Sequence, residues 1–115
     1  MKIIRVIMPI LLSVVEMVLS TLSGEVDYQQ FQQQLASKLN EVGREILKLV
    51  LQELDHQIKQ EKSKRPGWQV CRTGDRKEMI TCFGSISYER TYYRHKKTGQ
   101  YAYLVDEQVG YTPHM

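Results

Sequence analysis

The chain has 115 residues, of which 25% are charged and 42% are hydrophobic, and its formal net charge is +3. This length suits one small domain and is too short for most two-domain enzymes. Its two cysteines cannot build a disulfide framework or a zinc finger, so we expect a cytoplasmic protein. Residues 59–97 hold eleven Lys and Arg against four acids, a local charge of +7, which indicates a polyanionic partner.

Residues 1–22 have the outline of a signal sequence or membrane anchor, because two basic residues precede an apolar run at 10–19. Polar residues recur here at intervals of three and four, which places them on one stripe of an α-helix. The stripe consists of Lys2, Arg5, Pro9, Ser13, Glu16 and Ser20. An ionised Glu16 would cost about 2.5–3.5 kcal/mol at a bilayer centre. We therefore expect residues 1–24 to form an apolar helix that packs on protein and does not enter a membrane.

Residues 25–65 predict one long amphipathic helix. Asp27 followed by Gln30 has the spacing of a capping box, and apolar side chains then recur every three or four residues up to Ile58. Running to about Lys64, this helix would be roughly 55 Å long, more than a domain of this size can cover. Its apolar stripe fits either an ordinary core or a self-association seam, and the second reading predicts a homodimer through residues 28–58.

Residues 66–115 predict a small basic antiparallel sheet. Pro66 and Gly67 end the helix, and the segment beyond them holds eight of the ten aromatic residues with an apolar spacing close to two. We expect strands at 68–73, 78–83, 85–94 and 101–105, with turns at 74–77 and 96–99 and a bend at Gly84. The chain as a whole is predicted to be α+β, with domains at 1–24, 25–65 and 66–115.

Catalytic signatures are missing from the sequence. It contains no nucleophile elbow, phosphate loop, H-E-x-x-H pair or EF-hand spacing. The three histidines are scattered, His56 is expected to be solvated, and the acidic pair Asp106-Glu107 is more typical of a turn or helix cap than of a metal site. We therefore predict no catalytic residue, metal ligand or cofactor in this chain.

Seven basic residues in the predicted sheet form the candidate DNA-binding site. They are Arg72, Arg76, Lys77, Arg90, Arg94, Lys96 and Lys97. Their cations can neutralise phosphates, and the tyrosines between them offer stacking faces. A basic sheet also arises without such a function, since tyrosine favours strands and Lys or Arg keep sheet edges soluble. Alternation places Arg90 on the face of Tyr88 and Tyr92, so we expect its stem to pack.

Three ordered motifs occupy residues 82–94 (CFGSISYERTYYR), 97–101 (KTGQY) and 104–110 (LVDEQVG). Together with the long helix before them they resemble the N-terminal region of ISLre-type insertion-sequence transposases, a DDE family with an RNase H-like catalytic domain. The resemblance runs from about residue 26 to residue 114. It implies a fragment truncated before the catalytic domain, and divalent metal would be needed only in that missing domain. The zinc knuckle of related transposases is replaced here by residues 95–99, which contain no cysteine, so metal binding is not carried over.

The resemblance implies a non-catalytic fragment that contributes DNA binding, self-assembly or both to transposition, with the duplex DNA of transposon ends as partner. Two alternatives belong to other classes. One is a small membrane-associated or secreted protein that uses residues 1–22 as an anchor, and cell fractionation separates it from the others. The other is a helix-mediated dimerisation module without DNA binding, and salt-dependent retention on DNA separates it from the transposase fragment.

Overall fold

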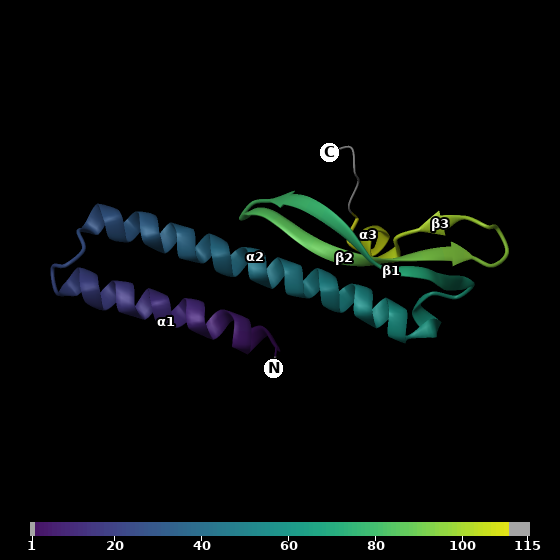
Figure 1. Ribbon diagram of the computed structural model, residues 1–115, viewed down its shortest axis with the longest axis horizontal. Coiled ribbons are helices and arrows are strands. Elements are labelled where there is room, and N and C mark those ends of the chain that lie inside the picture. Colours follow the sequence, from purple (N-terminus) through teal and green to yellow (C-terminus); the bar gives the residue numbers. More distant parts are fainter. Residues whose placement is uncertain (1, 111–115) are drawn as a thin grey trace. The chain divides into compact units, whose positions relative to one another are not determined.

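The computed structural model describes residues 2–110 and confirms the predicted α+β class (Figure 1). Two helices precede a three-stranded antiparallel sheet of order β1-β2-β3, in which Tyr93 of β2 pairs with Ala102 of β3. In chain order the elements are α1 (Lys2–Leu22), α2 (Tyr28–Gln60), the 3-10 turn η1 (Lys62–Lys64), β1 (Trp68–Thr81), β2 (Gly84–His95), β3 (Tyr101–Ala102) and α3 (Leu104–Gln108).

The boundaries of the two long helices follow local signals. The amide of Glu25 donates to the carbonyl of Ser20 at 3.0 Å, which closes the end of α1. The amide of Gln30 donates to the Asp27 carboxylate at 2.8 Å, so Asp27 caps the start of α2 as predicted. Pro9 lies inside α1, which continues through it. Within residues 2–110, α1 is the one helix long and apolar enough to cross a membrane, a property that core helices and signal sequences share.

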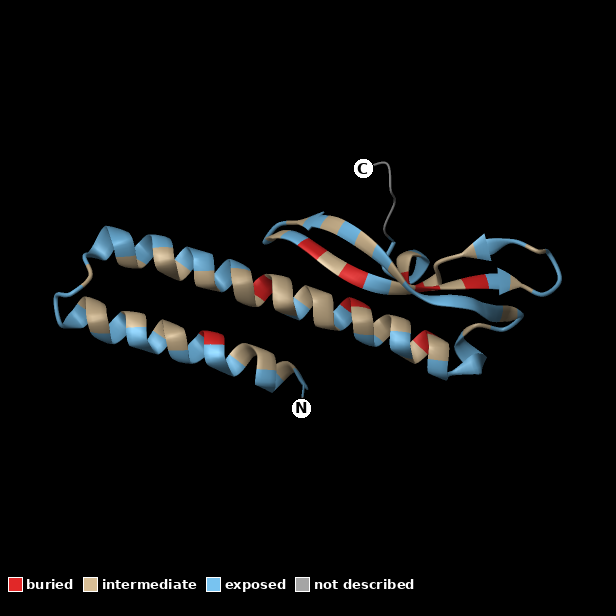
Figure 2. Ribbon diagram, in the orientation of Figure 1, coloured by how far each residue is buried: buried red, intermediate tan, exposed pale blue. Residues whose placement is uncertain are grey.

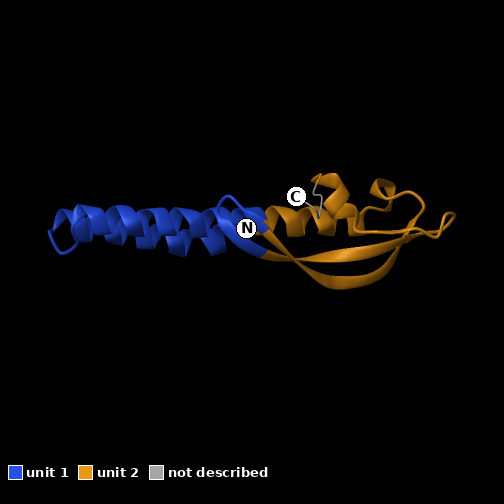
Figure 3. Cartoon of the chain, turned by 90° about the horizontal axis from the view of Figure 1, so that it is seen from above, with its two compact units in different colours: residues 1–47, 80–86 blue, residues 48–79, 87–115 orange. Residues whose placement is uncertain are grey.

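The chain divides into two compact units (Figure 3). Unit 1 comprises residues 1–47 and 80–86, and unit 2 comprises residues 48–79 and 87–115. In unit 1, α1 lies beside the first part of α2 (Figure 1), and the β1–β2 turn packs on that part of α2. Arg44 donates to the carbonyl of Phe83 at 2.8 Å, and a Cβ added at Gly43 would overlap the Phe83 ring. This close approach requires glycine at position 43.

In unit 2, both faces of β2 are covered, and the alternation predicted for this strand is confirmed. On one face the amide and hydroxyl of Thr91 donate to Asp55 of α2 at 2.9 and 2.8 Å. On the other face the hydroxyl of Tyr88 donates to Asp106 of α3 at 2.7 Å. The buried side chains of this unit lie on β2, on α2 and at Val105 (Figure 2). The core therefore depends on contacts between elements far apart in the sequence.

The predicted turn at 74–77 is wrong. β1 runs without a break from Trp68 to Thr81, with Gly74 inside it at a φ of +79°. The turn lies at residues 82–83 instead, where the Thr81 hydroxyl accepts the amide of Phe83 and donates to the carbonyl of Gly84. With the turn there, strands of 14 and 12 residues can pair along their length, which outweighs the local turn preference of Gly74 and Asp75.

The predicted last strand at 101–105 is also too long. β3 ends at Ala102, and Leu104–Gln108 forms the helix α3. Asp106 and Glu107 lie in the first turn of α3, where negative charge is favourable, as their helix-cap interpretation predicts. Helix formation buries Val105 completely and brings Asp106 to Tyr88.

Candidate nucleic-acid interface

Arg65 joins the end of α2 to the start of β1. Its guanidinium donates to the carbonyls of Ile58, Lys59 and Trp68 at 3.1, 3.0 and 2.8 Å. Two of these carbonyls belong to the last turn of α2, which has no further helix residues to satisfy them. The same guanidinium lies 5.5 Å from the ring centre of Tyr93. Arg65 therefore stabilises this corner of unit 2, although it also contributes positive charge to its surface.

The turn between β2 and β3 is fixed against the segment that follows Arg65. The amide of Lys96 donates to the carbonyl of Gly67 at 2.8 Å, and the rings of Trp68 and His95 meet edge to face at 4.9 Å. The amides of Lys97 and Thr98 lie 3.2 and 3.3 Å from the Nδ1 atom of His95, which accepts both hydrogen bonds. The predicted turn at 96–99 is confirmed, and it is held in place by backbone contacts rather than by its charged side chains.

A surface hollow of about 350 Å³ opens where these two segments meet. Its lining includes three basic residues, Lys62, Arg65 and Lys96, together with Trp68. Two further exposed cations lie close to Lys96 in the sequence. Arg94 is near the end of β2, opposite Tyr101 in the strand register, and Lys97 is on the β2–β3 turn. We call these five cations, Lys62, Arg65, Arg94, Lys96 and Lys97, the basic end.

Three of the seven predicted residues, Arg94, Lys96 and Lys97, belong to the basic end. All three are exposed, and none of their side chains has an ion-pair or hydrogen-bond partner among residues 2–110. Sequence reasoning missed Lys62 and Arg65 as site residues. Their signal was the charge run at residues 62–65, which indicated only the end of a helix.

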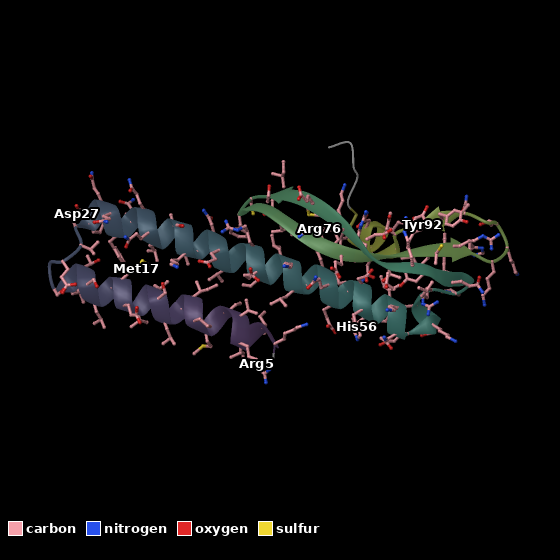
Figure 4. All side chains as sticks on the ribbon, in the orientation of Figure 1. Arg5, Met17, Asp27, His56, Arg76 and Tyr92 are labelled. Atoms are coloured by element: carbon pink, nitrogen blue, oxygen red, sulfur yellow. The ribbon has the colours of Figure 1, made fainter. Side chains whose placement is uncertain are left out.

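The other four predicted residues are engaged inside unit 2. Arg90 binds Asp106 at 2.5 Å and lies 3.6 Å from the ring centre of Tyr103, and only 12% of its side chain is exposed. Its packing, which the strand alternation predicted, makes it a structural residue. Arg76, labelled in Figure 4, donates to the hydroxyl of Ser87 at 2.7 Å. Lys77 is half-buried on β1.

Arg72 belongs to a small charged cluster. It binds Asp75 at 2.7 Å and lies 4.4 Å from the ring centre of Tyr92. Asp75 also accepts the hydroxyl of Tyr103 at 2.8 Å. The hydrogen bonds from Tyr103 and Arg72 lower the pKa of Asp75, and the bond to Asp75 raises the pKa of Arg72. The charge of Arg72 is therefore compensated by a carboxylate that stays ionised, unlike the charges of Arg94, Lys96 and Lys97.

A second hollow in unit 2, of about 310 Å³, has mixed charge. Its lining includes Asp55, Glu89, Lys59 and the exposed His56 (Figure 4), so it does not favour a polyanion. No group of three His, Cys, Asp or Glu side chains within the described part of the chain is arranged to hold a metal ion. The basic end is therefore the stronger candidate for a binding surface.

Comparison with known proteins gives a family without an assigned activity. The model of an uncharacterised protein family, UPF0236, matches residues 22–115. Two curated relatives from Caldanaerobacter subterraneus subsp. tengcongensis, both named UPF0236 proteins, are 43% and 41% identical over 70 residues. Each match covers 61% of this chain and 15% of the relative, so the chain spans only a small part of these proteins. No solved structure matches the chain. Because the family model covers most of its length, the chain belongs to the UPF0236 family.

Proposed function

We propose that the chain is the N-terminal, non-catalytic part of a transposase, and that its basic end binds the phosphates of duplex DNA at transposon ends. The observation that carries the proposal is a group of exposed cations, Arg94, Lys96 and Lys97, whose side chains have no partner within the described residues 2–110. They lie at the end of β2 and on the following turn, which is fixed by contacts with Gly67 and Trp68. Lys62 lines the adjoining hollow with Lys96. A fixed backbone that presents unpaired cations can meet a phosphate backbone with little loss of conformational freedom.

Two further observations support a mobile element. The motifs at residues 82–94, 97–101 and 104–110 resemble those of ISLre-type transposases. The name of the second relative joins eleven gene numbers of one organism, and the name of a third joins four. One protein carried at many positions of a genome is what a copying element leaves behind. Most of the relatives' length also lies outside the match and leaves room for a separate catalytic domain.

The proposed contacts are to phosphates and not to base edges. The cations lie on a strand end, on a turn, in the 3-10 segment η1 and at the residue after it, and none of them is on a helix that could enter a major groove. Binding should therefore have little sequence preference and a steep dependence on salt. Each neutralised phosphate contributes about −0.9 to the slope of log K against log salt concentration, so four contacts give a slope near −3.6.

Binding titrations of the full chain on duplex DNA at several salt concentrations test the proposal. The Arg94→Ala/Lys97→Ala variant should flatten the slope by roughly two units and weaken all DNA sequences alike. The control Lys38→Ala/Lys48→Ala removes the same charge from α2 and should leave the slope unchanged. Circular dichroism checks that each variant stays folded. An unchanged slope in the folded Arg94/Lys97 variant, or no binding at about 50 mM salt, would exclude the basic end as a DNA-binding surface.

A dimerisation module without DNA binding is the second candidate. It is favoured by the apolar side chains that remain exposed on the predicted seam of α2, which are Tyr28, Leu39, Ile46 and Val50. Phe31, Leu35, Val42 and Leu49 of the same stripe are half-buried within the chain. In this case the titrations above would detect no DNA binding while sedimentation would still detect a dimer.

A further inference from the structure

The outer side of α1 is apolar and exposed. Eight of its large apolar side chains are accessible, with exposed fractions from 37% at Val18 to 79% at Leu22, and only Ile10 is fully buried. The eight are Ile4, Met8, Leu11, Leu12, Val15, Val18, Leu19 and Leu22. Soluble proteins rarely expose a contiguous apolar surface of this size unless another surface covers it.

The spacing of these residues identifies the kind of surface that fits. Six of them follow one another at intervals of 4, 3, 4, 3 and 4, and this alternation of four and three is the seven-residue repeat of coiled-coil seams. These six are Ile4, Met8, Leu11, Val15, Val18 and Leu22, and we call them the outer seam. The less exposed residues of α1 repeat at the same intervals, from Ile3 through Ile10 to Thr21. Because α1 lies beside α2 (Figure 1), we infer from this lower exposure that α2 covers that side of α1. The outer seam therefore suits a second helix packed in the same way.

The polar stripe of α1 argues against a bilayer as the cover. Lys2, Arg5 and Glu16 are exposed on a stripe that runs along the whole helix beside the outer seam. A membrane-crossing orientation would take Glu16 into hydrocarbon, whereas a partner helix on the outer seam leaves the stripe in water. The family match begins at residue 22, so all of the outer seam except Leu22 lies outside the part of the chain that the family model describes.

The outer seam and the charges at the two ends of α1 both favour packing against α1 of a second copy in antiparallel orientation. The intervals between residues of the outer seam are the same whether counted from Ile4 or from Leu22. An antiparallel copy therefore places Ile4 opposite Leu22, and Leu11 opposite Val15. Lys2 and Arg5 lie at the start of α1, and the acids Glu25 and Asp27 follow its end. Antiparallel pairing brings the basic start of each copy to the acidic end of the other, and the helix dipoles also oppose. A parallel pair would place like charges together.

We propose that a second copy of this chain covers the outer seam, so that two α1 helices pair antiparallel and the two α1–α2 hairpins form a four-helix bundle. This differs from the dimer through residues 28–58 that the sequence predicted. The side chains that carry it are already exposed in the single chain, so pairing requires no rearrangement of unit 1.

Sedimentation of the full chain between about 1 and 100 μM tests the proposal, with a dimer expected. Leu11→Asp/Val15→Asp should give a monomer, because it places charge at the middle of the seam without disturbing contacts inside the chain. The control Gln29→Asp/Gln33→Asp adds two carboxylates at exposed positions of α2 and should remain a dimer. A milder variant, Leu11→Gln/Val15→Gln, should raise the dissociation constant at least about tenfold. A monomeric unmodified chain, or a dimeric Leu11→Asp/Val15→Asp variant, would overturn the proposal.

Disulfide cross-linking tests the orientation. With the exposed Cys71 and Cys82 replaced by serine, an Ile4→Cys chain and a Leu22→Cys chain are oxidised separately and as a mixture. Antiparallel pairing predicts a cross-linked dimer in the mixture alone. Cross-linking within either single variant, or in no sample, would overturn the antiparallel arrangement. Flotation of the unmodified chain with vesicles of phosphatidylcholine and phosphatidylglycerol would also overturn the proposal. It would indicate that a bilayer, and not a second copy of the chain, covers the outer seam.

Discussion

Two buried tyrosines on opposite faces of β2 differ in how their hydroxyls are satisfied. Tyr88 is 1% exposed and donates to Asp106, whereas Tyr93 is fully buried and its hydroxyl has no hydrogen-bond partner among residues 2–110. An unsatisfied buried hydroxyl opposes folding, while a satisfied one contributes modestly to stability. The two side chains therefore form a natural matched pair for mutation.

Tyr93→Phe should leave the free energy of unfolding unchanged or raise it by about 1 kcal/mol, because it removes a buried hydroxyl without a partner. Tyr88→Phe should lower it by about 1–2 kcal/mol, because Asp106 loses a hydrogen bond. Urea unfolding monitored by circular dichroism measures both. A larger loss for Tyr93→Phe than for Tyr88→Phe would contradict this assignment.

The stability of the protein at alkaline pH tests the burial of Tyr93. Burial raises the pKa of the Tyr93 phenol above its ordinary value of 10.0, and the nearby Asp55 carboxylate adds to the effect. The folded state thus holds this proton more tightly than the unfolded state. The resulting stability is fully present below pH 10 and is lost as the pH rises through the folded pKa. Urea midpoints measured from about pH 9 upward should fall less steeply in Tyr93→Phe, and an identical decline would count against the prediction.

At the scale of elements, the β1–β2 turn is anchored to α2 by a glycine inside the helix. Glycine is normally unfavourable in this position by about 0.5–1 kcal/mol relative to alanine. Gly43 is nevertheless suited to its place, because the ring of Phe83 occupies the space that a Cβ would need. The bond from Arg44 to the carbonyl of Phe83 holds the turn at this point.

Gly43→Ala should therefore destabilise the protein by about 1–3 kcal/mol, as overpacking does. In a Phe83→Ala background the same change should stabilise it by about 0.5–1 kcal/mol, because only the helix preference remains. A double-mutant cycle of urea unfolding measures the change of sign. If Gly43→Ala stabilises both backgrounds, the ring of Phe83 does not occupy that space.

At the scale of the whole molecule, the two proposed interactions depend on different physical forces. DNA binding by the basic end rests on phosphate neutralisation, and dimerisation through the outer seam rests on apolar burial. The charged ends of α1 add little to the second, since exposed ion pairs contribute about 0–1 kcal/mol.

Raising the salt concentration from about 50 to 300 mM should weaken DNA binding roughly 600-fold for a slope near −3.6 and leave the dimer nearly unchanged. Fluorescence anisotropy on labelled DNA and sedimentation of the free protein, under the same buffers, measure the two effects separately. Loss of the dimer in parallel with DNA binding would indicate that charge, not the outer seam, holds the two copies together.

Short-range features of the sequence determined the α+β class, the two helices, the Asp27 cap, the turn at 96–99 and the two faces of β2. Each depends on residues within a few positions of one another, since helix caps, periodicity and turn preferences act locally. The basic character of residues 59–97 was also evident, because charge can be counted without knowing the fold.

Only the tertiary structure decided which cations have partners within residues 2–110 and where the long hairpin turns. Arg90 is engaged by Asp106, 16 residues further along the chain, and Arg65 by carbonyls on both sides of a helix end. The turn moved to residues 82–83, because pairing of the long strands β1 and β2 outweighs the local preference of Gly74 and Asp75. These outcomes depend on groups that folding brings together across long stretches of chain, and no local pattern encodes such distances.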